Sequence, residues 1–317
     1  MMRLKNIDKI LIMKMEHIGD YILTLPALKI IRKDFPKAKI TVVVNSCNKE
    51  LAKKTPYVDD VIIFDNPLAK RNLRKLDILM ELIFHRRKYL HFFKSLNKKN
   101  YDMLIDFSNR KYSNFFLKNI NSKRKISGLD FNFGKINEGE RMIQILKKNN
   151  IVGNPKKLKI KISKKEKEKI NIEIKKRGIS DFIVIHAITP LPEKNWGLEK
   201  WGLLCKKLDK NIIFIGSNSD KKTIDAVILK FNLNHKCFNF AGMFDLSQTY
   251  ELIKKAQLMI CSDSGPMHLG ELTATPIIAL FGDTDEEIWG PRRKKDIIIK
   301  NKNIKNIKID EIIHNIR

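Results

Sequence analysis

Short apolar runs alternate with longer segments of helical periodicity from the start of the chain. Residues 9–13 form an apolar run of strand length, and residues 40–44 form a second one. Between them, residues 20–34 repeat large apolar side chains at helical spacing, directly after a glycine. A strand, a glycine turn, a helix and a second strand in this order are typical of a parallel βαβ unit. We therefore expect Asp20 to cap the first helix.

The alternation continues toward the C-terminus. Further strands are expected at 61–64, 103–106, 126–128, 182–185, 211–215, 238–240, 258–261 and 277–281. Further helices are expected at 138–148, 164–177, 198–208, 246–255 and 304–317. The strands of the second half end in polar loops, and open parallel sheets bind ligands at the carboxyl ends of their strands. The pattern therefore predicts an α/β protein with its site at these loops.

A break in the pattern near residue 155 predicts the domain organisation. Gly153-Asn154-Pro155 interrupts the periodicity, and a basic run follows it. A chain of 317 residues is long enough for two domains, each with its own core. We expect an N-terminal domain over 1–155, a C-terminal domain over 156–300 and a C-terminal helix over 301–317.

The segment 68–100 mixes basic residues with large apolar ones. Its central apolar residues fall at helical spacing: Leu76, Leu79, Met80, Ile83 and Phe84. One interpretation is an ordinary amphipathic helix that lies on the sheet. The other is a basic amphipathic surface that rests on an anionic membrane. Both can hold, because they involve different faces of the segment.

The stretch 258–291 combines two strand-like runs with one short helix between them. Ser264-Gly265-Pro266 would begin that helix, so its first backbone N–H groups would face the edge of the sheet. Such a helix start suits a phosphate, although a plain capped helix has the same sequence features.

Composition narrows the functional classes. The hydrophobic content of 43% fits a globular protein, and no apolar run has the length of a membrane-spanning helix. Together with an N-terminus that does not resemble a signal peptide, this predicts a cytoplasmic protein. The net charge of +28 comes with lysines spread along the whole chain and with no basic patch that is interleaved with aromatic residues. We therefore expect no nucleic-acid partner.

No metal site is expected either. The four cysteines are widely spaced and have no histidine nearby in the sequence, so they do not form a zinc motif. Asp283-Thr284-Asp285 has the Asp-x-Asp spacing of some metal-dependent glycosyltransferases, but a match of three residues is frequent by chance.

Several segments in both halves together resemble glycosyltransferase family 9, the heptosyltransferases of lipopolysaccharide core assembly. Residues 18–28 resemble the N-terminal motif of that family. Residues 186–196, 263–268, 275–276 and 281–285 resemble its donor-site motifs in the expected order. The resemblance covers both halves of the chain, and the Asp-Ser-Gly-Pro-Met-His block is its most specific part.

The resemblance implies a GT-B fold, in which two Rossmann-like domains with parallel sheets face each other across a cleft. It also implies an inverting transfer of heptose from ADP-heptose to a hydroxyl group of the lipopolysaccharide inner core, with Asp20 as the general base. The donor residues carried over from the family, or suggested by their place beside its motifs, are Thr189, Lys194, Asp220, Asp263, Ser264, Gly265 and His268. On the acceptor side we expect Gly19, Arg110 and Lys111.

The expected partners follow from this reaction. They are a nucleotide sugar as substrate, with no further cofactor, and an anionic lipid-linked oligosaccharide, so we expect contact with the cytoplasmic face of the inner membrane. Two alternatives remain. One is a family 9 transferase with a different nucleotide sugar or glycan acceptor, and the other is a catalytically silent nucleotide-sugar-binding protein.

Overall fold

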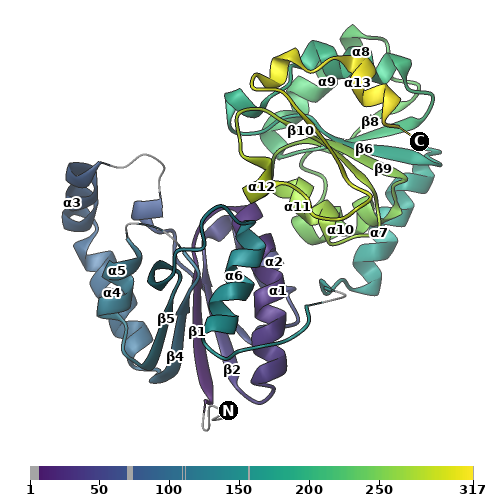
Figure 1. The fold of residues 1–317 in the computed structure, drawn as a ribbon. Helices are drawn as coiled ribbons and strands as arrows, with labels where there is room; N and C mark the ends of the chain where they lie inside the picture. Colours follow the sequence, from purple (N-terminus) through teal and green to yellow (C-terminus); the bar gives the residue numbers. More distant parts are fainter. Residues whose placement is uncertain (1–6, 70–73, 109, 111, 156–157, 317) are drawn as a thin grey trace. The chain divides into compact units, whose positions relative to one another are not determined.

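The computed structural model describes residues 7–69, 74–108, 110, 112–155 and 158–316. The chain forms two compact units, Met1–Lys159 and Ile160–Arg317, which are described one at a time. Figure 1 shows that each unit is a sheet with helices on both faces. This is the arrangement that alternating strands and helices produce, because each buried strand needs cover on two sides.

In the described part of the first unit, the sheet is five-stranded and parallel. Its strands are β1 (Lys9–Lys14), β2 (Lys39–Val44), β3 (Asp60–Ile63), β4 (Tyr101–Asp106) and β5 (Ser122–Ser127). They lie in the order β3-β2-β1-β4-β5, so the chain reverses its direction of winding between β1 and β4.

The helices of the first unit cover both faces of this sheet. They are α1 (Ile18–Asp34), α2 (Lys49–Lys53), α3 (Lys75–Phe84), α4 (Arg86–Asn97), α5 (Ser113–Asn119) and α6 (Glu138–Lys148). Figure 1 shows α1, α2 and α6 on one face and α4 and α5 on the other. A core of aromatic residues from α4 and α5 packs against Leu11, Met13 and Leu104 of the sheet.

The start of α1 differs from the prediction. The helix begins at Ile18, and its N-cap is His17. The prediction that Asp20 caps α1 is therefore wrong, because Gly19 adopts the helical conformation and belongs to the helix. Asp20 is an acidic residue of the first turn, where the helix dipole favours negative charge.

The segment that mixes basic and apolar residues forms two helices. α4 lies on the sheet with Tyr89, Phe92 and Phe93 buried, as the first interpretation expected. α3 buries only part of its apolar surface, since Ile78 and Leu82 contact the aromatic core while other large side chains stay exposed. Within the described ranges, no helix has the length and hydropathy needed to cross a membrane.

In the described part of the second unit, the sheet is six-stranded and parallel. Its strands are β6 (Phe182–His186), β7 (Asn211–Ile215), β8 (Cys237–Asn239), β9 (Leu258–Ser262), β10 (Ile277–Phe281) and β11 (Ile297–Lys300). The order β11-β10-β9-β6-β7-β8 is that of a dinucleotide-binding Rossmann sheet, with the reversal between β6 and β9.

The helices of the second unit are α7 (Lys164–Lys176), α8 (Leu198–Lys207), α9 (Lys221–Lys230), α10 (Leu246–Lys255), α11 (Gly265–Glu271), α12 (Glu286–Trp289) and α13 (Ile309–His314). α7, α8 and α10 agree with the helices predicted from the sequence, whereas α9, which the sequence pattern did not predict, follows the cap at residues 217–220. The last helix is shorter than expected, because a 3₁₀ turn at Ile304–Asn306 precedes it.

Candidate functional site

Both sheets reverse their winding beside strands that end in polar residues. In the first unit these strands are β1 and β4, and in the second unit they are β6 and β9. At such a point the two following loops separate, which leaves room for a ligand at the carboxyl edge of the sheet. The residues that the sequence singled out are concentrated at these two edges.

At the edge of the first unit, the buried Lys14 lies among three carboxylates. Its side chain is 2% exposed, and its Nζ lies 3.6 Å from Glu16, 3.9 Å from Asp20 and 3.6 Å from Glu138. Burial opposes the charge on this amine, but the three carboxylates outweigh burial and raise the pKa of Lys14. Lys14 is therefore a fixed cation 3.9 Å from Asp20.

Glu16 and Glu138 are held by partners of their own. Tyr112 donates a 2.7 Å hydrogen bond from Oη to Glu16, and Arg141 donates two bonds of 2.7 Å each to the carboxylate of Glu138. Burial opposes ionisation of Glu16, yet Lys14 and the nearby hydroxyl groups outweigh it and lower the pKa of Glu16. The cluster therefore favours the ionised form of Glu16.

Asp106, at the end of β4, is in a different situation. It is fully buried and accepts a 2.9 Å hydrogen bond from the backbone N–H of Ser108. Burial raises the pKa of Asp106 to about 6, and the negative charge of Glu16 adds to the effect. This carboxyl group is enclosed and is not available to a large substrate.

The predicted acceptor residues lie beside this cluster, as far as the structure describes them. Asp20 is 9% exposed, and Gly19 precedes it in the first turn of α1. Arg110 is exposed, and its charge contributes to the lowered pKa of Glu16, so it lies close to the cluster. Lys111 is outside the described residues. Asp20 thus keeps part of its surface accessible at this edge, and Lys14 fixes its position, so Asp20 is the candidate general base of the cluster.

At the edge of the second unit, the loop after β6 meets the end of β9 through an ion pair. Lys194 Nζ donates to Asp263, whose side chain is buried. Thr189 lies in the same loop, but its hydroxyl donates to the carbonyl of Leu191 at 2.9 Å, so the hydroxyl of Thr189 shapes the loop. The ammonium of Lys194 carries three donors and uses one of them for Asp263.

A second contact joins the ends of β6 and β9. Ser264 Oγ lies 3.0 Å from His186 Nδ1 and 3.0 Å from the carbonyl oxygen of Ser262. Because the carbonyl can only accept, the serine proton goes to it and His186 Nδ1–H donates to Ser264. Burial lowers the pKa of His186 to about 4, so the ring is neutral at pH 7.

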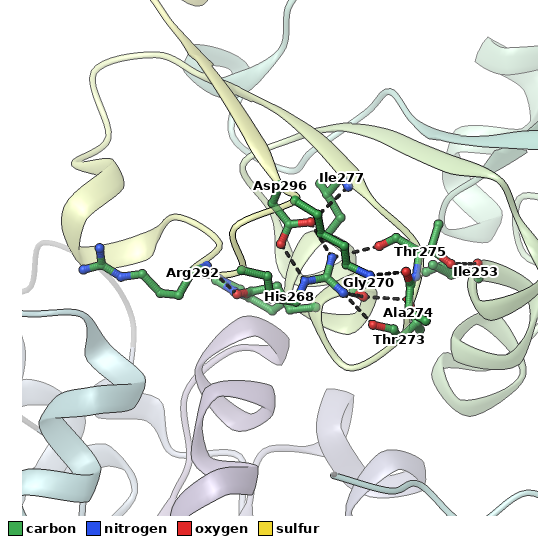
Figure 2. Close-up of polar contacts among 12 residues, drawn as sticks. Ile253, His268, Gly270, Thr273, Ala274, Thr275, Ile277, Arg292 and Asp296 are labelled. Carbon is green, nitrogen blue, oxygen red and sulfur yellow. Dashed lines mark hydrogen bonds and ion pairs between the residues drawn. The ribbon is translucent and has the colours of Figure 1, made fainter. Parts of the chain in front are cut away.

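His268 and Gly265 are on α11, the short helix that follows Ser264. Gly265 is its first residue and Ser264 is its N-cap, as the sequence predicted. His268 donates from Nδ1 to Glu271 at 2.8 Å, and Glu271 accepts a 3.1 Å bond from the backbone of Arg292 (Figure 2). The imidazole is thus fixed from one side by a carboxylate.

The residues after α11 form a network that holds the edge together. Arg293 donates to Asp296 and to the carbonyl groups of Gly270, Thr273 and Thr275, the four residues that Figure 2 labels around it. Thr275 in turn donates from its hydroxyl to the carbonyl of Ile253 at 2.6 Å, near the end of α10. The Thr275-Pro276 motif is therefore structural, and it contributes to the site by placing α11.

Two further residues that the sequence singled out lie in turns that follow strands of the second sheet. Asp220 accepts a 2.7 Å bond from Ser217 in the turn after β7, and its charge acts on His186. Asp285 caps α12 by accepting a 2.9 Å bond from Glu287. Over the described ranges, no group of three or more His, Cys, Asp or Glu side chains is placed to hold a metal ion.

The structure adds residues to the site that the sequence interpretation did not select. They are Lys14, Glu16, Glu138 and Arg141 in the first unit and His186 and Glu271 in the second. Lys14 could have been identified from the sequence, since a charged residue at the end of an otherwise buried strand requires a partner. Glu138 and Arg141 could not have been identified in this way, because a helix with mixed charges usually presents them to solvent.

A known protein family matches most of the chain. Residues 89–314 match the model of glycosyltransferase family 9 (heptosyltransferase). Lipopolysaccharide heptosyltransferase 3 of Escherichia coli is 22% identical over 294 residues, which covers 86% of this chain and 83% of that protein. Lipooligosaccharide heptosyltransferase 2 of Haemophilus influenzae is 28% identical over 114 residues, 34% of this chain and 33% of that protein.

Solved structures show the same fold. A family 9 glycosyltransferase from Veillonella parvula superposes with a TM-score of 0.78 at 20% identity, over 99% of this chain and 97% of that one. The E. coli heptosyltransferase WaaC with ADP superposes with a TM-score of 0.73 at 17% identity, over 96% of this chain and 98% of that one. The GT-B class, with two Rossmann-like domains, is thereby confirmed.

Proposed function

This chain belongs to glycosyltransferase family 9, the heptosyltransferase family, and from that premise we propose that it transfers heptose from ADP-heptose to a hydroxyl group of the lipopolysaccharide inner core. The observation that carries the proposal is the meeting of Lys194, Asp263 and Ser264 where β6 and β9 end. These residues come from two separate family motifs, and the fold brings them to the edge at which Rossmann sheets bind nucleotides.

On the donor side, the leaving group is ADP, whose β-phosphate gains negative charge as the bond to the sugar breaks. Lys194 is the proposed cation for this charge, and Asp263 holds its ammonium in place. The backbone N–H groups of Ser264 and Gly265 are the proposed donors at the start of α11. His268 is proposed to contact the donor through the side of its ring opposite Glu271. Thr189 and Asp220 support the loops around it.

On the acceptor side, Asp20 is the proposed general base. A sugar hydroxyl is a weak nucleophile, so a carboxylate must take its proton as the oxygen attacks the anomeric carbon. The new bond forms from that oxygen to the anomeric carbon, the bond from this carbon to the phosphate oxygen breaks, and ADP departs with the electron pair. A single displacement of this kind inverts the configuration. Gly19, Arg110 and Lys111 are proposed to contact the acceptor, whose anionic groups suit the two cations.

The acceptor is proposed to be lipid-linked, which would place the enzyme at the cytoplasmic face of the inner membrane. The relatives are named for lipopolysaccharide and lipooligosaccharide, and this supports an acceptor of that chemistry. No metal ion or further cofactor is part of the proposal.

The donor is tested with a panel of nucleotide sugars. We expect calorimetry to show the tightest binding for ADP-heptose, and we expect free ADP to bind more tightly than UDP or GDP. ADP-heptose that binds no better than UDP- or GDP-sugars would refute the proposed donor. Lys194→Met should weaken this binding, and Lys222→Met is its control for charge, because Lys222 is exposed in the same unit.

A further inference from the structure

α3 exposes a continuous apolar stripe that the first unit does not cover. The side chains of this stripe and their exposed fractions are Leu76 64%, Leu79 53%, Met80 43%, Ile83 60% and Phe84 74%. They follow the spacing of a single helix face, and Leu90 of α4 extends the surface with 58% exposure. Exposed apolar surface of this continuity marks an interaction site on a soluble domain.

The stripe is presented by a fixed helix. On its opposite face, α3 packs Ile78 and Leu82 against the aromatic core that includes Phe64 and Tyr89. α3 therefore has two apolar faces, one that anchors it to the unit and one that points outward. Figure 1 shows α3 at the end of the first unit toward which β1 runs, which is the edge that carries Asp20.

Cations flank the stripe. Arg86 and Arg87 are exposed at the start of α4, directly after Phe84 and His85, and Lys94 is exposed further along. α4 contains no acidic residue in its sequence. Each of the two acids of α3 has a neighbour: Asp77 pairs with Arg74 at 3.2 Å, and Glu81 lies 3.1 Å from His85, which is a counter-ion only when it is protonated. The surface therefore has an apolar centre and a positive border.

We propose that this surface, formed by the stripe on α3 together with Leu90, Arg86 and Arg87, inserts into the interface of an anionic lipid bilayer. The apolar side chains would enter the boundary between headgroups and acyl chains, and the arginines would bind lipid phosphates. A helix of ten residues is about 15 Å long, half the hydrocarbon thickness of a bilayer, so α3 lies in the plane of the membrane.

The charges around the stripe favour an anionic bilayer over two other possible partners, a second copy of the chain and a nucleic acid. A second copy of the chain would cover the apolar stripe, but it would offer Arg86 and Arg87 only the acids of its own α3, which already have neighbours. A nucleic acid would satisfy the arginines but leave the apolar centre without a partner. An anionic bilayer satisfies both. The inference rests on the proposed function and deepens it, because it gives the lipid-linked acceptor a contact surface at the same end of the first unit as Asp20.

The test is flotation of the full chain with lipid vesicles, which needs neither donor nor turnover. Vesicles of phosphatidylcholine alone are compared with vesicles that contain phosphatidylcholine and phosphatidylglycerol in equal parts. We expect the chain to bind the anionic vesicles, and we expect the double variant Ile83→Ser/Phe84→Ser to bind them at least about tenfold more weakly. The double variant Arg86→Ala/Arg87→Ala should also lose roughly tenfold or more.

Matched controls separate this surface from general properties of the chain. Leu229→Ser removes an apolar side chain that is 68% exposed on α9, and Lys175→Ala/Lys176→Ala removes two exposed charges of α7. Both controls should float as the wild type does.

Three outcomes would overturn the proposal. They are no flotation of the wild type with anionic vesicles at low salt, equal flotation of the α3 variant, and a wild-type dimer in gel filtration that Ile83→Ser/Phe84→Ser converts to a monomer. ADP binding, measured in parallel, reports on the proposed donor site and not on the lipid surface. A failure of the lipid surface is therefore distinguishable from a failure of the proposed function.

Discussion

At the scale of single residues, the neighbours of two carboxyl groups in the first unit decide what each can do. Asp20 has Lys14 3.9 Å away and keeps part of its surface accessible. Asp106 is fully buried, and the like charge of Glu16 acts on it. The first arrangement suits a group that meets a substrate, whereas the second places a carboxyl group where ionisation is costly.

The role of Asp20 as general base predicts a specific kinetic result. Asp20→Asn keeps the shape of the side chain but cannot take a proton, so kcat should fall by roughly 10²- to 10⁴-fold. Binding of ADP, measured by calorimetry, should remain near that of the wild type. Turnover close to the wild-type value would exclude Asp20 as the base.

Asp106 predicts a dependence of stability on pH. Its pKa is about 6 in the folded protein and 3.8 in the unfolded chain, so the folded state binds the proton more tightly. Below pH 3.8 the carboxyl group is protonated in both states, so its burial costs the folded state little stability. Above pH 6 it is ionised in both states, and the folded state is destabilised by the full cost of burying the charge. Asp106→Asn should therefore raise the free energy of unfolding at pH 7 to 8 by on the order of 3 kcal/mol.

Urea unfolding at several pH values checks this prediction. The advantage of Asp106→Asn should disappear as the pH falls from about 6 to about 4. The control is Asp8→Asn, an exposed position of the same unit, which should change stability little at any pH. A constant difference between Asp106→Asn and the wild type across this range would contradict the assignment.

At the scale of elements, the candidate donor site in the second unit depends on loops that pack tightly against neighbouring backbone. The turn after β7 carries Asp220, and Gly242 lies against it with a φ of +72° and a 3.0 Å bond from its N–H to Gly216. A Cβ at Gly242 would lie 2.7 Å from Cα of Asn218, which is backbone and cannot move aside cheaply. Glycine is therefore needed there for its conformation and for space.

The variant Gly242→Ala tests that packing. Alanine in the left-handed conformation costs about 1–2 kcal/mol, and the collision should add roughly 1–3 kcal/mol. Gly178→Ala is the matched control, because Gly178 has a φ of +62° and no atom within 4 Å of the added Cβ. Urea unfolding should show a larger loss for Gly242→Ala. Equal losses would mean that the backbone conformation alone matters.

At the scale of the whole molecule, the two compact units carry separate parts of the proposed reaction. Asp20 is in the unit that ends at Lys159, while Lys194 and Asp263 are in the unit that begins at Ile160. If donor binding depends on the second unit alone, changes in the two units should act independently on it.

A double variant checks this separation. Lys194→Met should weaken ADP binding by roughly tenfold to a hundredfold, because a charge-assisted bond to phosphate is lost. Adding Asp20→Asn should leave that affinity unchanged, while Lys222→Met alone should have no effect. Thermal melting of each variant shows whether the loss of the partner of Asp263 has unfolded the protein. A further loss of ADP affinity in the double variant would mean that Asp20 takes part in donor binding.

The sequence by itself determined most elements of the fold. The apolar runs marked β1, β2, β4, β6, β7, β9 and β10 to within a residue or two, because strands buried on both faces are continuous hydrophobic runs. β11 was missed, since its short isoleucine run lies between lysines and resembles a loop. The motifs of residues 186–196 and 263–268 predicted the second candidate site, and the fold brings them to one edge because they follow strands that are adjacent in the sheet.

Only the tertiary structure decided which charges pair and which apolar residues stay exposed. Lys14 and Glu138 are far apart in the sequence, and they meet because α6 packs beside α1 at the end of β1. In the same way, the periodicity of α3 showed an apolar helix but not which face the core would use. Hydrophobic pattern is a local property that fixes each element, whereas burial and pairing depend on which elements fold against one another.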